Sequence, residues 1–288
     1  MIHLLGFLGV LSISFAAIFV RLANVSAATV TFFRALYAIP LLFVVWWARR
    51  PAERRSAPER WMAFASGLIL ALDLTLWHES IHFIGAGLGT MLVNIQVLFV
   101  GTAAWVLFRE RPTGLALLTV PVVLAGVVLI SGLGRPDAYG SNPAAGVVLG
   151  VLAAGCYAGF LLTYRAANRG SGSPVGPLLD ATLGTVVGAA LVGVPFDPQF
   201  SLAITWPAHE WLIALAVICQ SAGWLLIGIA LPRLPALETS VMLLAQPLGT
   251  VVWGRLVFAE RFSPVQAAGM LLMLGGIATL TLRGSVRP

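Results

Sequence analysis

The stretch FRERPTGLALLTVPVVLAGVVLI, residues 108–130, has three charged residues in its first four positions and none afterwards. A helix crosses the hydrocarbon core of a bilayer with about 20 apolar residues. The run that begins at 114 is long enough to do so, and the charged residues before it mark a boundary with water. The stretch therefore predicts a membrane-spanning helix at 114–132.

The whole chain has the same character. Of its 288 residues, 59% are hydrophobic and 10% are charged, whereas a soluble domain carries about 25% charged residues. This balance excludes a disordered protein and argues against a soluble one. The 17 basic residues are all Arg and lie mostly between apolar runs, a pattern typical of loops beside a membrane. We therefore expect membrane lipid, and not nucleic acid, around this chain.

Ten apolar runs are long enough to span a membrane. They are too long and too rich in Gly, Ala and Leu for the roughly ten-residue alternating strands of an outer-membrane barrel. We therefore predict an all-α polytopic membrane protein. The predicted spans are 3–21, 26–48, 61–83, 87–108, 114–132, 145–166, 174–194, 211–231, 236–258 and 265–283.

The distribution of Arg predicts the orientation. With the N-terminus in the cytoplasm, the inside segments hold twelve Arg, and the outside loops hold only Arg21, Arg135 and Arg261. Inside loops carry the excess of basic residues, so both termini are predicted to be cytoplasmic. The run RRPAERRSAPER at 49–60 contributes five of the twelve. Without these five, the inside segments still hold more Arg residues than the outside loops.

An internal repeat relates the two halves of the chain. A shift of 150 positions lays 61–127 on 211–277, which aligns Gln96 with Gln246 and Glu110-Arg111 with Glu260-Arg261. A shift of 144 relates VRLAN at 20–24 to YRAAN at 164–168, and a shift of 146 sets Arg34 against Asp180. These matches predict one repeat at 1–132, a linker at 133–144 and a second repeat at 145–288.

Each predicted repeat contains five spans. Because five is odd, the two repeats must enter the membrane from opposite sides, as an inverted repeat with its pseudo-two-fold axis in the membrane plane. This architecture is typical of transporters that expose a midplane site alternately to the two sides of the membrane.

The residues FRERPT at 108–113 and FAERFS at 258–263 resemble the motif that closes the fourth and ninth helices of drug/metabolite transporters with EamA repeats. The segments LLTVPVVLAGVVLI at 117–130 and AAGMLLMLGGIATL at 267–280 resemble the helix that follows it in that family. Arg34 in TFFRAL matches the family's second-helix Arg. The second half matches the family's pattern, including its Gln-Pro pair, at Gln246-Pro247. The first half has Val97 where the family usually has that Pro.

The resemblance implies a ten-helix inner-membrane exporter of amino acids and other metabolites. Among the branches of the family, the chain is most similar to the YddG-type exporters of aromatic amino acids. Two complete repeats in one chain suffice for a monomer, so no obligate protein partner is expected.

Polar and aromatic side chains deep in the spans are the candidates for a small-molecule path, since a charge inside a bilayer is costly and normally faces protein or a water-filled cavity. A zwitterion needs an acceptor for ammonium, a donor for carboxylate and an apolar or aromatic wall. The predicted substrate-binding residues are Trp77, His78, Asn94, Tyr157, Gln220, Trp224 and Gln246. The charges predicted to serve coupling or structure are Arg34, Asp73, Glu79 and Asp180.

Each candidate has a structural alternative. Trp residues also anchor helices at the membrane surface, and buried amides often bond between helices. The pairs Gly155xxxGly159 and Gly184xxxGly188 predict close helix packing. Pro247 removes one backbone hydrogen bond and is the predicted gating bend of the ninth span.

Other functional classes find less support. We find no DxxxD, GxGD, HExxH or GxSxG motif for an intramembrane enzyme, and a P-loop is impossible without Lys. Cys156 and Cys219 lie alone in apolar runs, so neither a metal site nor a cofactor is indicated. A channel, a flippase and a carrier of phosphorylated sugars remain alternatives, the last with Arg34 or Arg255 in place of Lys.

Overall fold

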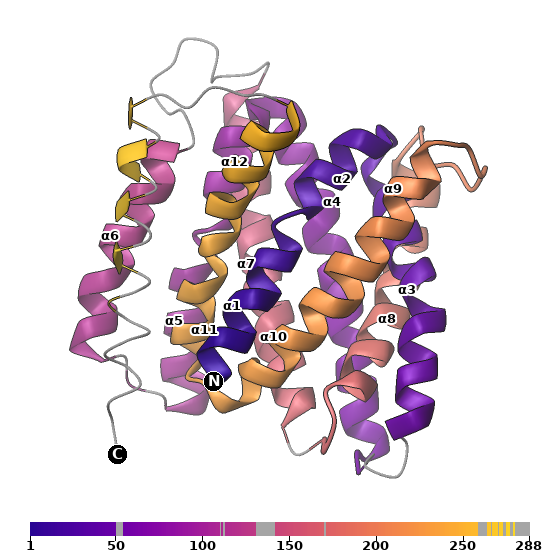
Figure 1. Cartoon of the computed structure of the whole chain (residues 1–288), viewed down its shortest axis with the longest axis horizontal. Helices are drawn as coiled ribbons and strands as arrows, with labels where there is room; N and C mark the ends of the chain where they lie inside the picture. Colours follow the sequence, from indigo (N-terminus) through magenta and orange to yellow (C-terminus); the bar gives the residue numbers. More distant parts are fainter. Residues whose placement is uncertain are drawn as a thin grey trace. The chain divides into compact units, whose positions relative to one another are not determined.

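Helices make up the regular structure of the described residues. The computed structural model describes residues 1–49, 54–109, 111, 113–130, 142–169 and 171–258, and separate positions between 264 and 279 (Figure 1). Glu110, Glu260 and Arg261 lie outside the described residues, as do most of the predicted linker 133–144 and much of the predicted tenth span.

Six of the described helical segments are long and apolar enough to cross a membrane. They are Ile2–Ala23, Ala27–Arg49, Ala57–Ser80, Ala144–Asn168, Val175–Phe196 and Ala208–Arg233. Three shorter apolar segments, Gln96–Leu107, Leu117–Gly126 and Val241–Gly254, lie in further helices. The prediction of an all-α polytopic protein is confirmed at this level, while ten spans remain a prediction.

The helix ends follow local rules. At the start of α4 (Ala57–Val93) the Ser56 backbone N–H donates to Glu59 Oε2 at 2.7 Å, which is one of the two bonds of a capping box. The Asn142 side chain accepts the Ala145 N–H at the start of α7 (Pro143–Asn168), with a distance of 3.1 Å. Asn24 ends α2 (Ala16–Ala23) with a left-handed φ of 50°, a conformation that Asn tolerates better than most residues.

One compact unit contains residues 1–75 and 159–233. In it α3 (Ala27–Arg49) packs along α8 (Val175–Phe196), and α1 (Ile2–Ile13) packs on α10 (Trp224–Ala230) (Figure 1). Between α9 (Ala208–Ala214) and α10 the chain forms η3 (Leu215–Gly223), a π-helical segment. Ser221 Oγ donates to the carbonyl oxygen of Ala216, five residues earlier, at 2.8 Å. The 3-10 turn η4 (Leu231–Arg233) follows α10.

The other compact unit contains residues 76–158 and 234–288. Here α11 (Ala236–Leu243) packs on α5 (Gln96–Phe108) and α6 (Gly114–Ile130), and α12 (Ala245–Phe258) follows α11 after the single residue Leu244. Ser80 Oγ, in the part of α4 that belongs to this unit, donates to the Gly146 carbonyl oxygen of α7 at 2.7 Å. Each unit therefore combines segments from both halves of the sequence.

Two helix boundaries differ from those predicted. The separation of the third and fourth predicted spans at 84–86 is wrong, because α4 continues to Val93 and the interruption lies at Asn94 and Ile95. No Pro and no charged residue lies between 83 and 93, and the three glycines there weaken a helix without removing a backbone hydrogen bond as Pro does. The ninth predicted span, 236–258, is interrupted at Leu244, within one turn before Pro247, where the imide nitrogen cannot donate and the ring crowds the preceding turn.

The two predicted glycine pairs behave differently. A Cβ at Gly184 would lie 2.0 Å from the Phe64 carbonyl oxygen, and one at Gly188 would lie 2.7 Å from the Ala71 Cβ. These contacts confirm that α8 and α4 approach closely at this pair. The prediction for the other pair is wrong, because a Cβ at Gly155 would meet nothing within 4 Å and one at Gly159 would make an ordinary 3.7 Å contact with Ile69. Small residues permit close packing, but the facing helix decides whether it occurs.

Candidate functional site

A buried polar chain joins three helices of the first unit. Arg34 on α3 is 8% exposed, and its Nε donates to Gln220 Oε1 on η3 at 3.1 Å. Gln220 Nε2 in turn donates to Thr182 Oγ1 on α8 at 3.3 Å. Two predicted residues from opposite halves of the sequence are therefore in direct contact, and Thr182 is an additional member that sequence reasoning missed.

Asp73 on α4 supplies a negative charge in the same unit. Its side chain is buried, and Oδ1 has no hydrogen-bond partner among the described residues. The positive charge of Arg34 acts on it electrostatically. A carboxylate inside a spanning helix is costly unless it is paired or used, so Asp73 has both a neighbouring cation and an acceptor atom that can bind a ligand.

Aromatic rings form a second buried group in this unit. Trp224, which is 4% exposed, meets Phe160 edge-on with ring centroids 5.0 Å apart, and Tyr164 edge-on at 6.1 Å. Phe160 and Tyr164 stack with their centroids 5.6 Å apart. The position of Trp224 excludes the membrane-surface anchoring alternative, because that role needs an exposed ring end.

Asp180 does not belong to the Arg34 chain. The alignment of Arg34 with Asp180 suggested related positions in the two repeats, yet the partners of Asp180 are Arg55 Nη1 at 2.9 Å and Arg60 Nε at 3.4 Å. Arg55 is buried and Arg60 is about half exposed. Asp180 therefore ties the start of α4 to α8, and the arginine run at 49–60 contributes packing contacts besides its predicted effect on topology.

The remaining predicted residues belong to the second unit. The rings of Trp77 and His78 have centroids 4.9 Å apart, and Trp77 Nε1 is buried without a hydrogen-bond partner among the described residues. Asn94 is 9% exposed and lies at the interruption between α4 and α5. Tyr157 and Gln246 are half-buried on α7 and α12, and Glu79 is exposed on α4.

Three further side chains on one face of α7 were missed although the sequence carried a signal for them. Phe160, Tyr164 and Asn168 follow one another at intervals of four on α7, a spacing that places them on one helix face. A second missed contact joins Tyr37 Oη and His209 Nδ1 at 2.6 Å. His209 Nε2 lies 3.1 Å from the Ala203 carbonyl oxygen, so a neutral His209 donates there and accepts from Tyr37. No sequence motif connects those residues.

This arrangement is suited to binding. It combines a guanidinium group held by Gln220, a carboxylate with one oxygen that has no partner among the described residues, and a buried aromatic group, all on helices long enough to span a membrane. In the described part of the chain, no group of three or more His, Cys, Asp or Glu side chains could hold a metal ion.

Three curated proteins are similar over most of their length. A Synechocystis protein named Uncharacterized transporter sll1319 is 27% identical over 236 residues, which are 81% of this chain and 69% of that protein. The Bacillus subtilis protein named Uncharacterized transporter YwfM is 23% identical, over 84% of this chain and 79% of that protein. The Pseudomonas aeruginosa protein PA1977 is 27% identical over the same shares.

A solved crystal structure has the same fold, with a TM-score of 0.83, 99% of both chains covered and 18% sequence identity. A family model, the EamA-like transporter family, matches residues 1–132 and 144–282. The match covers nearly the whole chain, and this membrane protein therefore belongs to the EamA-like transporter family.

Proposed function

We propose that this chain is a secondary transporter that exports amino acids, including aromatic ones, and related small metabolites across the bacterial inner membrane. In this proposal ten spans form two inverted five-helix repeats, both termini are cytoplasmic, and one chain suffices. Substrate passes by alternating access through a midplane cavity between the repeats.

The observation that carries the proposal is the pairing of Arg34 with Gln220, together with the buried Asp73, on which the Arg34 charge acts and whose Oδ1 has no partner in the described part of the chain. A zwitterionic substrate needs a donor for its carboxylate and an acceptor for its ammonium group. Arg34 and Gln220 supply donors and Asp73 supplies the acceptor, so opposite charges are available without a net charge in the path. Asp73 thereby acquires a substrate-binding role besides its predicted coupling role.

Aromatic side chains support the inclusion of aromatic substrates. The Trp224, Phe160 and Tyr164 rings meet edge-on or stacked at 5.0 to 6.1 Å, and in this proposal the aromatic side chain of a substrate packs against this group by the same kind of ring contact. We assign His78, Asn94 and Gln246 to polar contacts and Trp77 and Tyr157 to further wall positions.

The positions of the helix interruptions support the two-repeat arrangement. One lies at Asn94 and Ile95, and the other lies at Leu244. Asn94 and Leu244 are separated by 244 − 94 = 150 residues, the shift that aligns the two halves of the sequence. The family model also matches in two segments, 1–132 and 144–282. In this proposal the Leu244 interruption, together with Pro247, acts as the gating bend.

The proposal is tested by counterflow in proteoliposomes with labelled phenylalanine, threonine and glucose 6-phosphate, with and without a proton gradient. We expect uptake of both amino acids and not of the sugar phosphate. Asp73→Asn should abolish amino-acid counterflow, because the amide is a weaker acceptor for ammonium. Glu210→Gln is the control: it removes an exposed carboxylate from α9, in the same unit as Asp73, and should retain activity.

The outcomes separate the alternatives. Counterflow of glucose 6-phosphate alone would replace the amino-acid assignment with a phosphorylated substrate. Phenylalanine counterflow that is equal in Asp73→Asn and Glu210→Gln would remove Asp73 from the site. A gradient requirement that disappears in Asp73→Asn, with gradient-independent counterflow retained, would assign Asp73 to proton coupling instead of substrate binding.

A further inference from the structure

An exposed apolar loop connects α8 to α9 in the first unit. Its sequence, DPQFSLAITWP at 197–207, contains one charged residue, Asp197. Leu202, Ile204 and Trp206 are 59%, 64% and 66% exposed, and Figure 1 shows the loop at the upper end of α9. Neighbouring large apolar side chains that the protein leaves uncovered mark a surface that contacts a partner or a membrane.

The backbone of this loop is held against the protein. The Ser201 N–H donates to Thr29 Oγ1 on α3 at 3.0 Å, and His209 Nε2 lies 3.1 Å from the Ala203 carbonyl oxygen. The three exposed apolar residues alternate with these bonded positions and follow them along the chain. They are therefore presented by a loop that is fixed at two points.

One apolar residue of the loop does pack inward. Phe200 is half-buried, and its ring meets Phe32 of α3 edge-on with centroids 5.8 Å apart. A Cβ on Gly193 of α8 would lie 2.7 Å from Phe200 Cδ2, so this ring occupies the space beside the glycine. The first unit thus covers Phe200 and leaves the three apolar residues after it uncovered.

The length of α8 places the loop at a membrane surface. A helix of 22 residues is about 33 Å long, which is close to the thickness of about 30 Å of the hydrocarbon core. Val187, Leu191 and Val194 are exposed at helical spacing on α8, so they form one apolar face of a candidate membrane span. Phe196, the last residue of α8, is also exposed. The exposed apolar surface therefore continues from the span into the loop.

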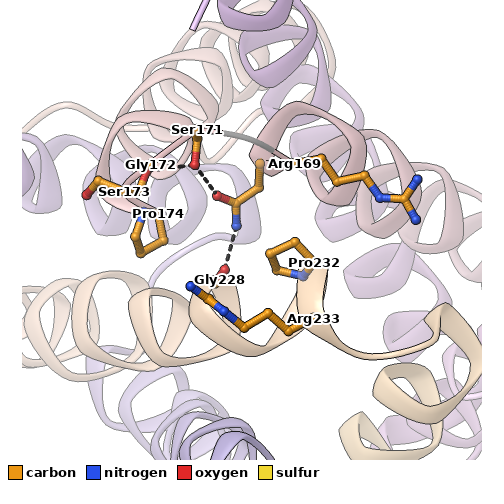
Figure 2. Close-up of a pocket in the computed structure, with 9 residues that line it drawn as sticks. Arg169, Ser171, Gly172, Ser173, Pro174, Gly228, Pro232 and Arg233 are labelled. Atoms are coloured by element: carbon orange, nitrogen blue, oxygen red, sulfur yellow. Dashed lines mark hydrogen bonds between the residues drawn. The ribbon is translucent and has the colours of Figure 1, made fainter. Parts of the chain in front are cut away.

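The loop at the other end of α8 has the opposite character. Its sequence, RGSGSP at 169–174, contains no large apolar residue. Ser171 Oγ donates to Asn168 Oδ1 at 3.0 Å, and Asn168 Nδ2 donates to the Gly228 carbonyl oxygen at 2.6 Å (Figure 2). A polar connection is thus possible between spans of this unit, and the apolar composition of 197–207 is a particular feature of that loop.

We propose that the loop 197–207 docks onto the lipid bilayer and inserts Leu202, Ile204 and Trp206 into its interfacial region. Trp is enriched at this depth because its ring is amphipathic. The non-helical backbone stays among the headgroups, where water completes its hydrogen bonds, since unpaired backbone is excluded from the hydrocarbon core. The loop has no basic residue, so a zwitterionic lipid suffices and anionic lipid is not required.

A fluorescent label at position 204 tests the insertion. The full-length protein carries Cys156→Ala, Cys219→Ala and Ile204→Cys, is labelled with nitrobenzoxadiazole and is placed as one copy in a phosphatidylcholine nanodisc. We expect quenching by phosphatidylcholine that has a nitroxide on its acyl chain close to the headgroup. Iodide in the water should quench the label at least about threefold less than the same label in Glu210→Cys, because Glu210 is an exposed, charged position that follows the loop.

A second pair of variants separates apolar insertion from charge. Leu202→Asp should lower lipid quenching of the label at 204 at least about twofold, because insertion depends on the apolar area that is buried. Gln199→Asp adds the same charge at an exposed polar position of the loop and should leave the quenching unchanged. Neither variant should shift the unfolding temperature in detergent, since both side chains are exposed.

The contrary outcomes are distinct. Equal iodide quenching at 204 and 210, without lipid quenching, would place the loop in water and overturn the proposal. Protection at 204 that appears only when two copies share a nanodisc would assign the surface to a second copy of this chain instead of lipid. Equal losses of lipid quenching in Leu202→Asp and Gln199→Asp would overturn the insertion of Leu202. None of these readouts uses transport, so the inference does not depend on the proposed export function.

Discussion

Asp180 Oδ2 and Arg55 Nη1 lie 2.9 Å apart although 125 residues separate them in the sequence. The pair connects α8 with the segment that leads into α4. Both side chains are nearly excluded from solvent, with exposed fractions of 9% and 1%. The same carboxylate oxygen has a second neighbour, Arg60, whose side chain is 55% exposed.

The two arginines should therefore differ in their contribution to stability. Arg55→Gln leaves Asp180 without its buried partner and should lower the free energy of unfolding by about 3 kcal/mol or more. Arg60→Gln removes a solvent-screened pair and should cost less than about 1 kcal/mol. Denaturant unfolding in detergent measures both. Equal losses would show that Asp180 does not distinguish the two partners.

The close approach of α4 and α8 should not tolerate a methyl group. Gly184→Ala would place a Cβ 2.0 Å from the Phe64 carbonyl oxygen and should lower the free energy of unfolding by at least about 1 to 3 kcal/mol. Gly155→Ala, on α7, is the matched control because nothing lies within 4 Å of its Cβ position. The control should be neutral or stabilising by about 0.5 to 1 kcal/mol. Thermal unfolding followed by Trp fluorescence gives the comparison, and a stable Gly184→Ala would contradict the packing.

Gln220 should be required to keep Arg34 in place. Gln220→Leu removes the acceptor for Arg34 Nε and the donor to Thr182. The buried guanidinium group then lacks one hydrogen bond, which should cost about 1 to 3 kcal/mol. Gln199→Leu, at an exposed position, should stay within about 0.5 kcal/mol of the unmodified protein. Similar unfolding midpoints for the two variants would contradict a structural role of Gln220.

The Tyr37 hydroxyl should contribute to the stability of the loop before α9. Tyr37→Phe removes the donor to His209 Nδ1 and should cost about 0.5 to 1.5 kcal/mol. It should also increase hydrogen exchange at 200–207, because His209 Nε2 contacts the Ala203 carbonyl oxygen in that segment. Exchange measured by mass spectrometry reports the local effect. Unchanged protection there would mean that Tyr37 does not orient the His209 ring.

Pro247 shows which helix interruptions can be predicted from single residues and which cannot. The imide predicts a disturbance in the preceding turn, and the structure interrupts the helix at Leu244. The corresponding position of the first half, Asn94, is also at an interruption although Val97 replaces the proline. A single-residue rule explains the first break and does not predict the second.

The candidate site was predicted in part. Reasoning about buried polar residues selected Arg34, Asp73, Gln220 and Trp224, which are buried in the first unit. Thr182 and Phe160 were missed because a Thr or a Phe in an apolar helix is common. The sequence also carries no sign that η3 is π-helical, and this geometry changes the direction of side chains around Gln220.

The amino-acid sequence by itself determined that this chain is a helical membrane protein with the motifs of EamA-repeat transporters. It could do so because span length and apolar composition are local properties, set by bilayer thickness and backbone hydrogen bonding. Only the tertiary structure decided which polar side chains are partners: Asp180 forms ion pairs with Arg55 and Arg60, and Arg34 donates a hydrogen bond to Gln220. The physical reason is that two side chains can meet only if their helices have matching depths, the right rotation about their axes and a short separation. These properties depend on contacts between residues far apart in the chain, such as the contact of Gly184 with Phe64.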